Sequence, residues 1–187
     1  KKLTEKFSSP TILYLGRIKK YKRVDLLVKI FSQIVNKVPQ ARLIIAGWGT
    51  EASMVTELVM KSPLRRKISL MGPVNTEEKK SRLSKSWVFV NPSIGEGWSI
   101  AVIEANLWGT PAIAFKVPGL LESIRDGETG LLANNEHDLV EKICTLLTDN
   151  ALRERLSGNA IVWAKSFDWE RSARESIEIL ERIRSGK

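Results

Sequence analysis

Short apolar runs alternate with amphipathic stretches along the chain, and this alternation constrains the fold more than any other feature. Five runs cover residues 11–16, 41–47, 67–72, 86–91 and 111–116, and a shorter candidate covers residues 130–133. Their apolar residues are consecutive rather than alternating, which is typical of strands buried on both faces of a parallel sheet. The sequence therefore predicts a mostly parallel sheet of about six strands.

The amphipathic stretches predict helices. Residues 23–38 carry apolar side chains at helical spacing, and residues 76–85 begin with Thr76 as an expected N-cap, followed by acidic residues. Three more helices are predicted at 136–150, 151–166 and 169–184. Alternating βα units of this kind predict a single α/β, Rossmann-like domain over residues 1–187, with helices on both faces of the sheet and a helical C-terminal tail at about 169–187.

Composition excludes several classes of protein. The 187 residues are 43% hydrophobic and 27% charged, so neither disorder nor a fibrous repeat is expected. No apolar stretch approaches the ~20 residues of a membrane span, and the first residues have no apolar signal-peptide core, so a cytoplasmic location is expected. Cys144 and His137 are the single cysteine and histidine, which excludes a disulfide framework, a zinc cluster and, in practice, a histidine-based nucleophile triad.

The net charge of +9 calls for an anionic partner or a strongly solvated surface. Two basic clusters contribute to it: Lys19, Lys20, Lys22 and Arg23 in the first, and Lys61, Arg65, Arg66 and Lys67 in the second. Such clusters suit nucleic acid, an anionic membrane face or a phosphorylated ligand. Aromatic residues are not interleaved with either cluster as they would be in a base-stacking platform, so no nucleic-acid partner is expected.

Ligands of doubly wound sheets bind at the carboxyl ends of the strands, and three segments lie there. The first, GWGTEA at residues 47–52, fits the G-x-G-x-x-G/A dinucleotide pattern. That pattern also requires an acidic residue at the end of the next strand, but this strand ends in Met71, Gly72, Pro73 and Val74. A structural turn, or a backbone approach to some other ligand, is favoured over an NAD site.

The second segment, residues 16–25, follows the first predicted strand and contains Arg17 and Lys22. An arginine fork and a lysine point charge at a strand exit suit a phosphate group. A solvated loop explains this segment equally well when it is considered alone.

The third segment, residues 91–115, is the most informative. Glu104 is the one charge between Trp98 and Phe115, and an acid in so apolar a run is expected to have a polar partner. A helix is expected to start near Trp98 or Ser99, just after Gly95, Glu96 and Gly97. The first N–H groups of this helix, on Ser99, Ile100 and Ala101, would form an anion site. Glu96 and Glu104 would flank this site, which is the layout that a nucleotide sugar requires: hexose hydroxyls, a diphosphate, then ribose hydroxyls.

Glu96 and Glu104 have the E-x7-E spacing, within GEGWSIAVIEA, and GTPAIA and VPGLLESIRDGETGLL follow. Together with Arg17 and Lys22, these motifs resemble the C-terminal, donor-binding half of a glycosyltransferase family 4 (glycosyl transferases group 1) enzyme over roughly residues 11–168. That family consists of retaining enzymes with two Rossmann-like halves, the GT-B fold.

The resemblance implies a role for each matching residue. Arg17 and Lys22, beside Gly16, would bind the donor diphosphate, Glu96 the hexose hydroxyls and Glu104 the ribose. Arg17, Lys22 and Glu96 would be the catalytic set. The N–H groups of Ser99, Ile100 and Ala101 would bind the distal phosphate or the sugar, and Gly97 and Trp98 would lie beside the sugar. The backbone from Met71 and Gly72 to Val74 would face the base. Gly47 and Gly49 would line the nucleotide cleft. The family often has glycine where this chain has Ser99, and Trp98 could instead staple the helix by packing.

The resemblance also implies a UDP- or GDP-linked sugar as donor substrate, with no cofactor. The chain has no D-x-D motif, so no metal is expected. The acceptor would bind to an N-terminal half absent from this chain, so the chain alone is expected to transfer no sugar. A lipid-linked acceptor, with the enzyme peripheral to the inner face of a membrane, is compatible with the basic clusters. The alternatives are a non-catalytic nucleotide-binding or regulatory module of the same fold, and a Rossmann oxidoreductase.

Overall fold

A computed structural model of the chain describes residues 5–185, so residues 1–4 of the predicted domain and 186–187 of the predicted tail lie outside the described residues. The strands are β1 (Thr11–Leu15), β2 (Arg42–Ala46), β3 (Ile68–Gly72), β4 (Val88–Asn91), β5 (Ala112–Phe115) and β6 (Gly130–Ala133). They form one sheet in the order β3-β2-β1-β4-β5-β6, and every pairing between neighbours is parallel. The predicted Rossmann-like α/β sheet of six strands is confirmed.

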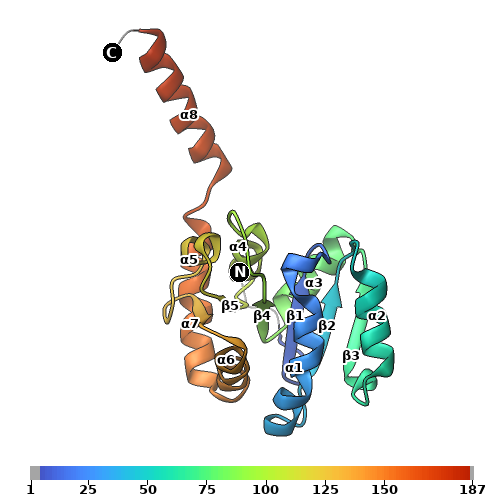
Figure 1. Cartoon of the computed structure of the whole chain (residues 1–187). Helices are drawn as coiled ribbons and strands as arrows, with labels where there is room; N and C mark the ends of the chain where they lie inside the picture. The colour runs from blue at the N-terminus through green and yellow to red at the C-terminus, as the bar shows by residue number, and fades with distance from the viewer. Residues whose placement is uncertain (1–4, 186–187) are drawn as a thin grey trace.

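Helices cover both faces of this sheet (Figure 1). The helices are α1 (Val24–Lys37), α2 (Ala52–Lys61), α3 (Thr76–Lys85), α4 (Ile100–Leu107), α5 (Pro118–Ser123), α6 (Glu136–Thr148), α7 (Asn150–Lys165) and α8 (Trp169–Arg184), with single turns η1 (Lys20–Lys22) and η2 (Arg65–Lys67). Successive side chains of a strand point to opposite faces, so Ile12 and Tyr14 of β1 pack with α1, α2 and α6, whereas Leu13 packs with α3, α4 and α5. The sheet is therefore buried on both sides, as the consecutive apolar runs predict.

The last two helices differ in their packing. Helix α7 packs against α4 of the same domain, whereas α8 projects away from the layered body (Figure 1). Along α8 the large apolar side chains are exposed: Ile177, Ile179, Leu180 and Ile183. Helix α7 therefore completes this domain. Among the described residues, none of the helices is both long and apolar enough to span a membrane.

Three local predictions need correction. Thr76 is not the N-cap of α3: Asn75 is, because its side chain accepts a hydrogen bond from the Glu78 N–H while the Glu78 carboxylate accepts one from the Asn75 N–H. Helix α5 was not predicted, since Pro118 and Gly119 suggest a turn, although proline is well placed at the start of a helix. The apolar sequence patterns around Trp87, Trp108 and Trp163 predict core positions, but the structure leaves these three side chains only half-buried.

Candidate functional site

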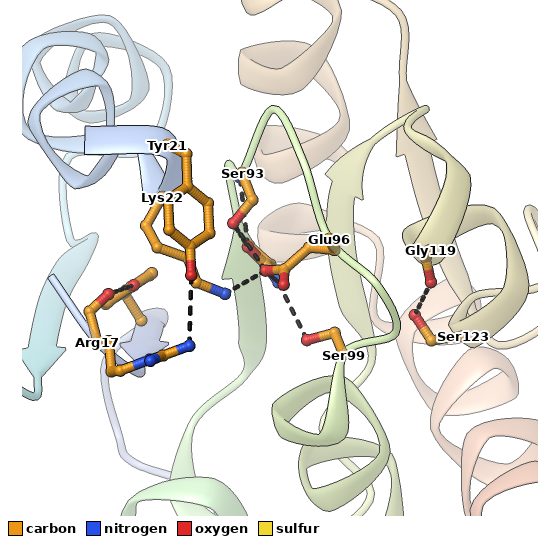
Figure 2. Close-up of polar contacts among 10 residues, drawn as sticks. Arg17, Tyr21, Lys22, Ser93, Glu96, Ser99, Gly119 and Ser123 are labelled. Carbon is orange, nitrogen blue, oxygen red and sulfur yellow. Dashed lines mark hydrogen bonds and ion pairs between the residues drawn. The ribbon is translucent and has the colours of Figure 1, made fainter. Parts of the chain in front are cut away.

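The order of the strands brings two loops together at one point. Chain connections run outward from β1 to β2 and β3 and then return to β4 on the other side of β1. The carboxyl ends of β1 and β4 therefore flank a topological switch point, where α/β sheets bind ligands. The loop after β1 supplies Arg17 and Lys22, and the loop after β4 supplies Glu96 and Ser99 (Figure 2).

Glu96 lies at the centre of a buried polar cluster. Its Oε1 atom accepts hydrogen bonds from Lys22 Nζ, from Asn91 Nδ2 at 3.1 Å and from Ser93 Oγ at 2.9 Å (Figure 2). The Lys22 and Glu96 side chains are only 14% and 9% exposed. An ion pair this deeply buried needs further hydrogen bonds to offset its desolvation, and Asn91 and Ser93 provide them.

These contacts also set the ionisation of Glu96. Burial alone would raise the pKa of its carboxyl group, but the hydrogen bonds from Lys22, Asn91 and Ser93, together with the Lys22 charge, outweigh burial and lower the pKa below its usual value. Glu96 is therefore an anion at neutral pH. It can accept hydrogen bonds but cannot serve as a proton donor.

Two members of this cluster, Asn91 and Ser93, were not predicted as site residues. Asn91 ends β4 and is 3% exposed, and Ser93 is fully buried. A polar residue closing the apolar run Val88–Asn91 is a sequence signal for them, because a buried polar group requires a partner.

Arg17 is held through its backbone rather than its guanidinium group. Its carbonyl oxygen accepts a hydrogen bond of 2.7 Å from the hydroxyl of Tyr14, which lies beneath the loop and is 2% exposed. Burial, and next the negative charge of Glu96, raise the pKa of that hydroxyl, so it remains protonated. The exposed guanidinium group makes a long contact of 3.5 Å with the Tyr21 hydroxyl, and its charge faces solvent beside Lys22.

The glycines of the GWGTEA segment have a structural role. Hydrogen bonds from Gly16 N to Ala46 O (3.0 Å) and from Ile18 N to Trp48 O (2.9 Å) join the loops after β1 and β2. A Cβ on Gly47 would lie 1.9 Å from the Gly16 carbonyl oxygen, and one on Gly49 would lie 2.1 Å from that of Ile18. This close approach gives a structural reason for both glycines, in agreement with the interpretation of the segment as a structural turn.

The start of α4 has the predicted geometry. Ser99 is its N-cap residue, and among the described residues no group accepts a hydrogen bond from the backbone N–H of Ser99, Ile100 or Ala101. Behind this point, Gly119 of α5 packs on the loop that carries Glu96, because a Cβ there would lie 2.3 Å from the Glu96 carbonyl oxygen. The unused N–H groups and the helix dipole make this helix terminus favourable for an anion.

Glu104 has the polar partner that the sequence predicts, but it is not deeply buried. Lys79 of α3 lies 2.5 Å from its Oε1 atom, and both side chains are about one-third exposed, at 32% and 33%. Glu104 therefore remains accessible to solvent, separate from the Glu96 cluster.

Trp98 packs as a staple. Its ring meets that of Phe167 edge to face at 4.8 Å, and Phe167 meets Trp163 in the same way at 4.6 Å. Beside them, α4 and residues 164–175 line a groove of about 640 Å³. Trp98 thus fixes the segment between α7 and α8 against the start of α4.

The remaining predicted positions lie along the same edge of the sheet. Gly16 follows β1, Met71 and Gly72 end β3, and Val74 follows in the loop before α3. The Gly72 carbonyl accepts a hydrogen bond of 2.7 Å from Gly47 N, so the loops after β1, β2 and β3 are joined in sequence. Gly97 lies in the exposed loop just before α4.

The single histidine and the single cysteine do not belong to the Glu96 cluster. His137 is exposed on α6, 3.7 Å from Glu141, and Cys144 is buried, with its thiol pKa raised by that burial. Within residues 5–185, no three His, Cys, Asp or Glu side chains are grouped closely enough to hold a metal ion.

The profile of the glycosyl transferases group 1 family matches residues 1–163, and the chain belongs to this family. It is 28% identical over 194 aligned positions to a D-inositol 3-phosphate glycosyltransferase of Nocardioides sp., covering 93% of this chain and 42% of that relative. The chain spans less than half the length of the curated relatives it matches.

Solved structures agree with the family assignment. Sucrose-phosphate synthase from Thermosynechococcus elongatus superimposes with a TM-score of 0.86 at 28% identity, over 96% of this chain and 47% of that one. The pneumococcal O-GlcNAc transferase GtfA, solved in complex with UDP and GlcNAc, superimposes with a TM-score of 0.84 at 25% identity, over 97% of this chain and 38% of that one. The resemblance found in the sequence is thereby confirmed.

Proposed function

We propose that this domain binds a nucleotide-diphosphate sugar and forms the donor half of a retaining, metal-independent glycosyltransferase. The observation that carries the proposal is the meeting, at one switch point, of three features: the cations Arg17 and Lys22, the unused N–H groups at the start of α4, and the ionised Glu96. Cations and N–H groups suit a diphosphate, and a carboxylate suits sugar hydroxyls.

The proposal assigns a role to the charged residues, the helix terminus and the strand-end loops. Arg17, Lys22 and the N–H groups of Ser99 to Ala101 hold the diphosphate, Glu96 the hexose hydroxyls and Glu104 the ribose. The loops at Gly16, Gly47, Gly49 and Met71–Val74 border the nucleotide, and the base is uracil or guanine. The UDP held by the related O-GlcNAc transferase supports a nucleotide ligand of this kind.

The chemical step follows from the charges. The bond between the anomeric carbon and the diphosphate oxygen breaks, the acceptor oxygen bonds to that carbon on the same face, and the acceptor proton passes to the departing diphosphate. Arg17, Lys22 and the α4 terminus stabilise the charge that develops on the leaving group, which is the principal contribution of this domain. Lys22 also pairs with Glu96, so one cation serves both the carboxylate on the sugar side and the phosphate.

Transfer also needs a positioned acceptor. Correct positioning of the acceptor lowers a reaction barrier by ~7–11 kcal/mol. The relatives are more than twice as long as the region they share with this chain, and we assign acceptor binding to an N-terminal half within that additional length. The exposed apolar residues of α8 suit contact with such a half. We expect residues 1–187 alone to bind the donor without transferring sugar. A lipid-linked acceptor at the inner face of a membrane, with a cytoplasmic enzyme, fits the +9 net charge.

A regulatory module of the same fold that binds nucleotide but does not catalyse is the second candidate. The ionised Glu96 beside the cations favours the enzyme, because a module that binds only a nucleotide has no use for a carboxylate placed for sugar hydroxyls. Transfer by a chain that includes the acceptor half separates the two candidates.

The two acids provide the test of the proposal. Glu104→Gln is expected to weaken a nucleoside diphosphate and its sugar-linked form alike, whereas Glu96→Gln weakens only the sugar-linked form. Each lost charge-assisted hydrogen bond corresponds to about a 10- to 150-fold change in Kd. Isothermal titration of both variants with UDP, UDP-glucose, GDP and GDP-mannose measures this, with thermal unfolding as the control for folding. Identical profiles for the two variants would refute the assignment.

A further inference from the structure

The side chain of Asn91 is hydrogen-bonded inside the Glu96 cluster through both its amide nitrogen and its amide oxygen. Its Nδ2 group donates to Glu96 Oε1 and to Ser99 Oγ, each at 3.1 Å. Its Oδ1 atom accepts from the Ser93 N–H at 3.3 Å and lies 2.5 Å from the Ser93 hydroxyl, whose single proton is shared between this oxygen and Glu96 Oε1. Asn91 and Ser99 are only 3% and 4% exposed, so water does not compete for these bonds. One amide thus joins the loop that carries Glu96 to Ser99, the N-cap of α4.

This arrangement leaves two polar atoms available. Lys22, Asn91 and Ser93 all bond to Oε1 of Glu96, and no described residue donates to Oε2. Ser99 Oγ accepts from Asn91, and no described residue accepts the hydroxyl proton of Ser99. The site therefore offers one acceptor, Glu96 Oε2, and one donor, the Ser99 hydroxyl, on side chains that the same amide holds.

We infer that Asn91 is a positioning residue that sets Glu96 and Ser99 so that together they recognise one free hydroxyl group of the donor sugar. This inference rests on the proposed function and adds to it a specificity subsite. A sugar hydroxyl can donate to Glu96 Oε2 and accept from Ser99 in the same geometry. A deoxy, fluoro or O-methyl group at that position cannot do both, and a site built to bond a hydroxyl strongly rejects an analogue that lacks it.

The subsite also explains why Ser99 is compatible with the site. The family often has glycine at this position, and a serine side chain could crowd a donor. Asn91 holds the Ser99 oxygen by a hydrogen bond beside Glu96, so the hydroxyl becomes a ligand-binding group. Asn91 and Ser99 are therefore expected to depend on one another.

The experiment compares Asn91→Leu, which removes the amide at similar volume, with a matched control, Asn106→Leu. Asn106 is also a fully buried asparagine, on α4, but it bonds to no residue of the cluster. Titration calorimetry measures Kd for UDP, UDP-glucose, GDP and GDP-mannose. Asn91→Leu is expected to weaken the better sugar-linked ligand about tenfold or more while changing its bare diphosphate by less than about twofold, as loss of a hydrogen bond to a charged group implies. Asn106→Leu is expected to change neither Kd.

A second measurement does not depend on ligand. The Glu96 carboxyl pKa, followed by NMR titration, is expected to rise in Asn91→Leu and to stay low in Asn106→Leu, since Asn91 donates directly to that carboxylate. Ser99→Ala is a milder variant in case Asn91→Leu fails to fold, and it too is expected to weaken the sugar-linked ligand selectively.

The outcomes separate the inference from the proposed function. If the wild-type domain binds none of the nucleotide sugars, the proposed function fails and the inference fails with it. If the wild type binds them, and Asn91→Leu or Ser99→Ala weakens the bare diphosphate as much as its sugar-linked form, or weakens neither, only the inference is overturned.

Discussion

Gly47→Ala is expected to be among the most destabilising single-methyl changes in this domain. A Cβ at position 47 would lie 1.9 Å from the Gly16 carbonyl oxygen, whereas ordinary contact begins near 3.4 Å, so the two loops would have to separate by about 1.5 Å. Such a movement breaks the Gly16–Ala46 and Ile18–Trp48 hydrogen bonds, at about 1 kcal/mol each. The φ angle of +140° at Gly47 adds a strain of about 1–3 kcal/mol. The expected loss is about 3–5 kcal/mol of unfolding free energy.

Gly158→Ala is the matched control for this change. Gly158 lies exposed within α7, and no atom lies within 4 Å of a Cβ built there. The substitution is expected to stabilise the domain by about 0.5–1 kcal/mol through helix propensity. Urea denaturation followed by circular dichroism measures both variants. A loss below about 1 kcal/mol for Gly47→Ala would show that the loops are not held as closely as these contacts require.

Three further predictions concern single residues. The lowered pKa of Glu96 stabilises the fold at pH values above about 4.3, and this contribution is lost as the pH falls through the pKa of Glu96 in the folded state. Glu96→Gln should therefore reduce the slope of unfolding free energy against pH in the acidic range. An unchanged slope would contradict this. Asn106→Leu should raise the unfolding free energy by about 1–2 kcal/mol in urea titrations, because both polar atoms of the buried Asn106 side chain lack a described partner, and lower stability would contradict it. Arg17→Ala should weaken the binding of UDP or GDP by about 10- to 150-fold while leaving the binding of uridine or guanosine nearly unchanged. This loss should depend on salt concentration, and the control Lys20→Ala, at an exposed lysine, should not show it. Equal losses of affinity for nucleoside and diphosphate would contradict a phosphate-binding role for Arg17.

The fold could be predicted because its signals are local. Consecutive apolar runs mark strands buried on both faces, and all six runs are strands within one or two residues of the expected bounds. The N-cap of α3 was misassigned because both Asn75 and Thr76 are good caps, and only the return bond from Glu78 decides between them. Helix α5 has six residues and starts with Pro-Gly, so sequence periodicity cannot reveal it.

Residue types at strand exits point to some residues of the candidate site, but not to Asn91 and Ser93 or to the contacts among them. Arg17, Lys22, Glu96 and the start of α4 follow from residue type at strand exits. The Lys22–Glu96 pair joins residues 74 positions apart, and which atoms meet depends on how β1 and β4 set the two loops. The Lys79–Glu104 pair depends in the same way on how α3 packs beside α4.

The central claim is that the domain binds a nucleotide sugar and not a dinucleotide. Titration calorimetry of the wild-type chain with UDP-glucose, GDP-mannose and NAD tests this claim most directly. A thermal-shift measurement is a second assay for the same binding, because a ligand at ~10 times its Kd raises the unfolding free energy by about 1.4 kcal/mol. The account predicts saturable binding of at least one nucleotide sugar and none of NAD. Saturable NAD binding without binding of either nucleotide sugar would contradict it.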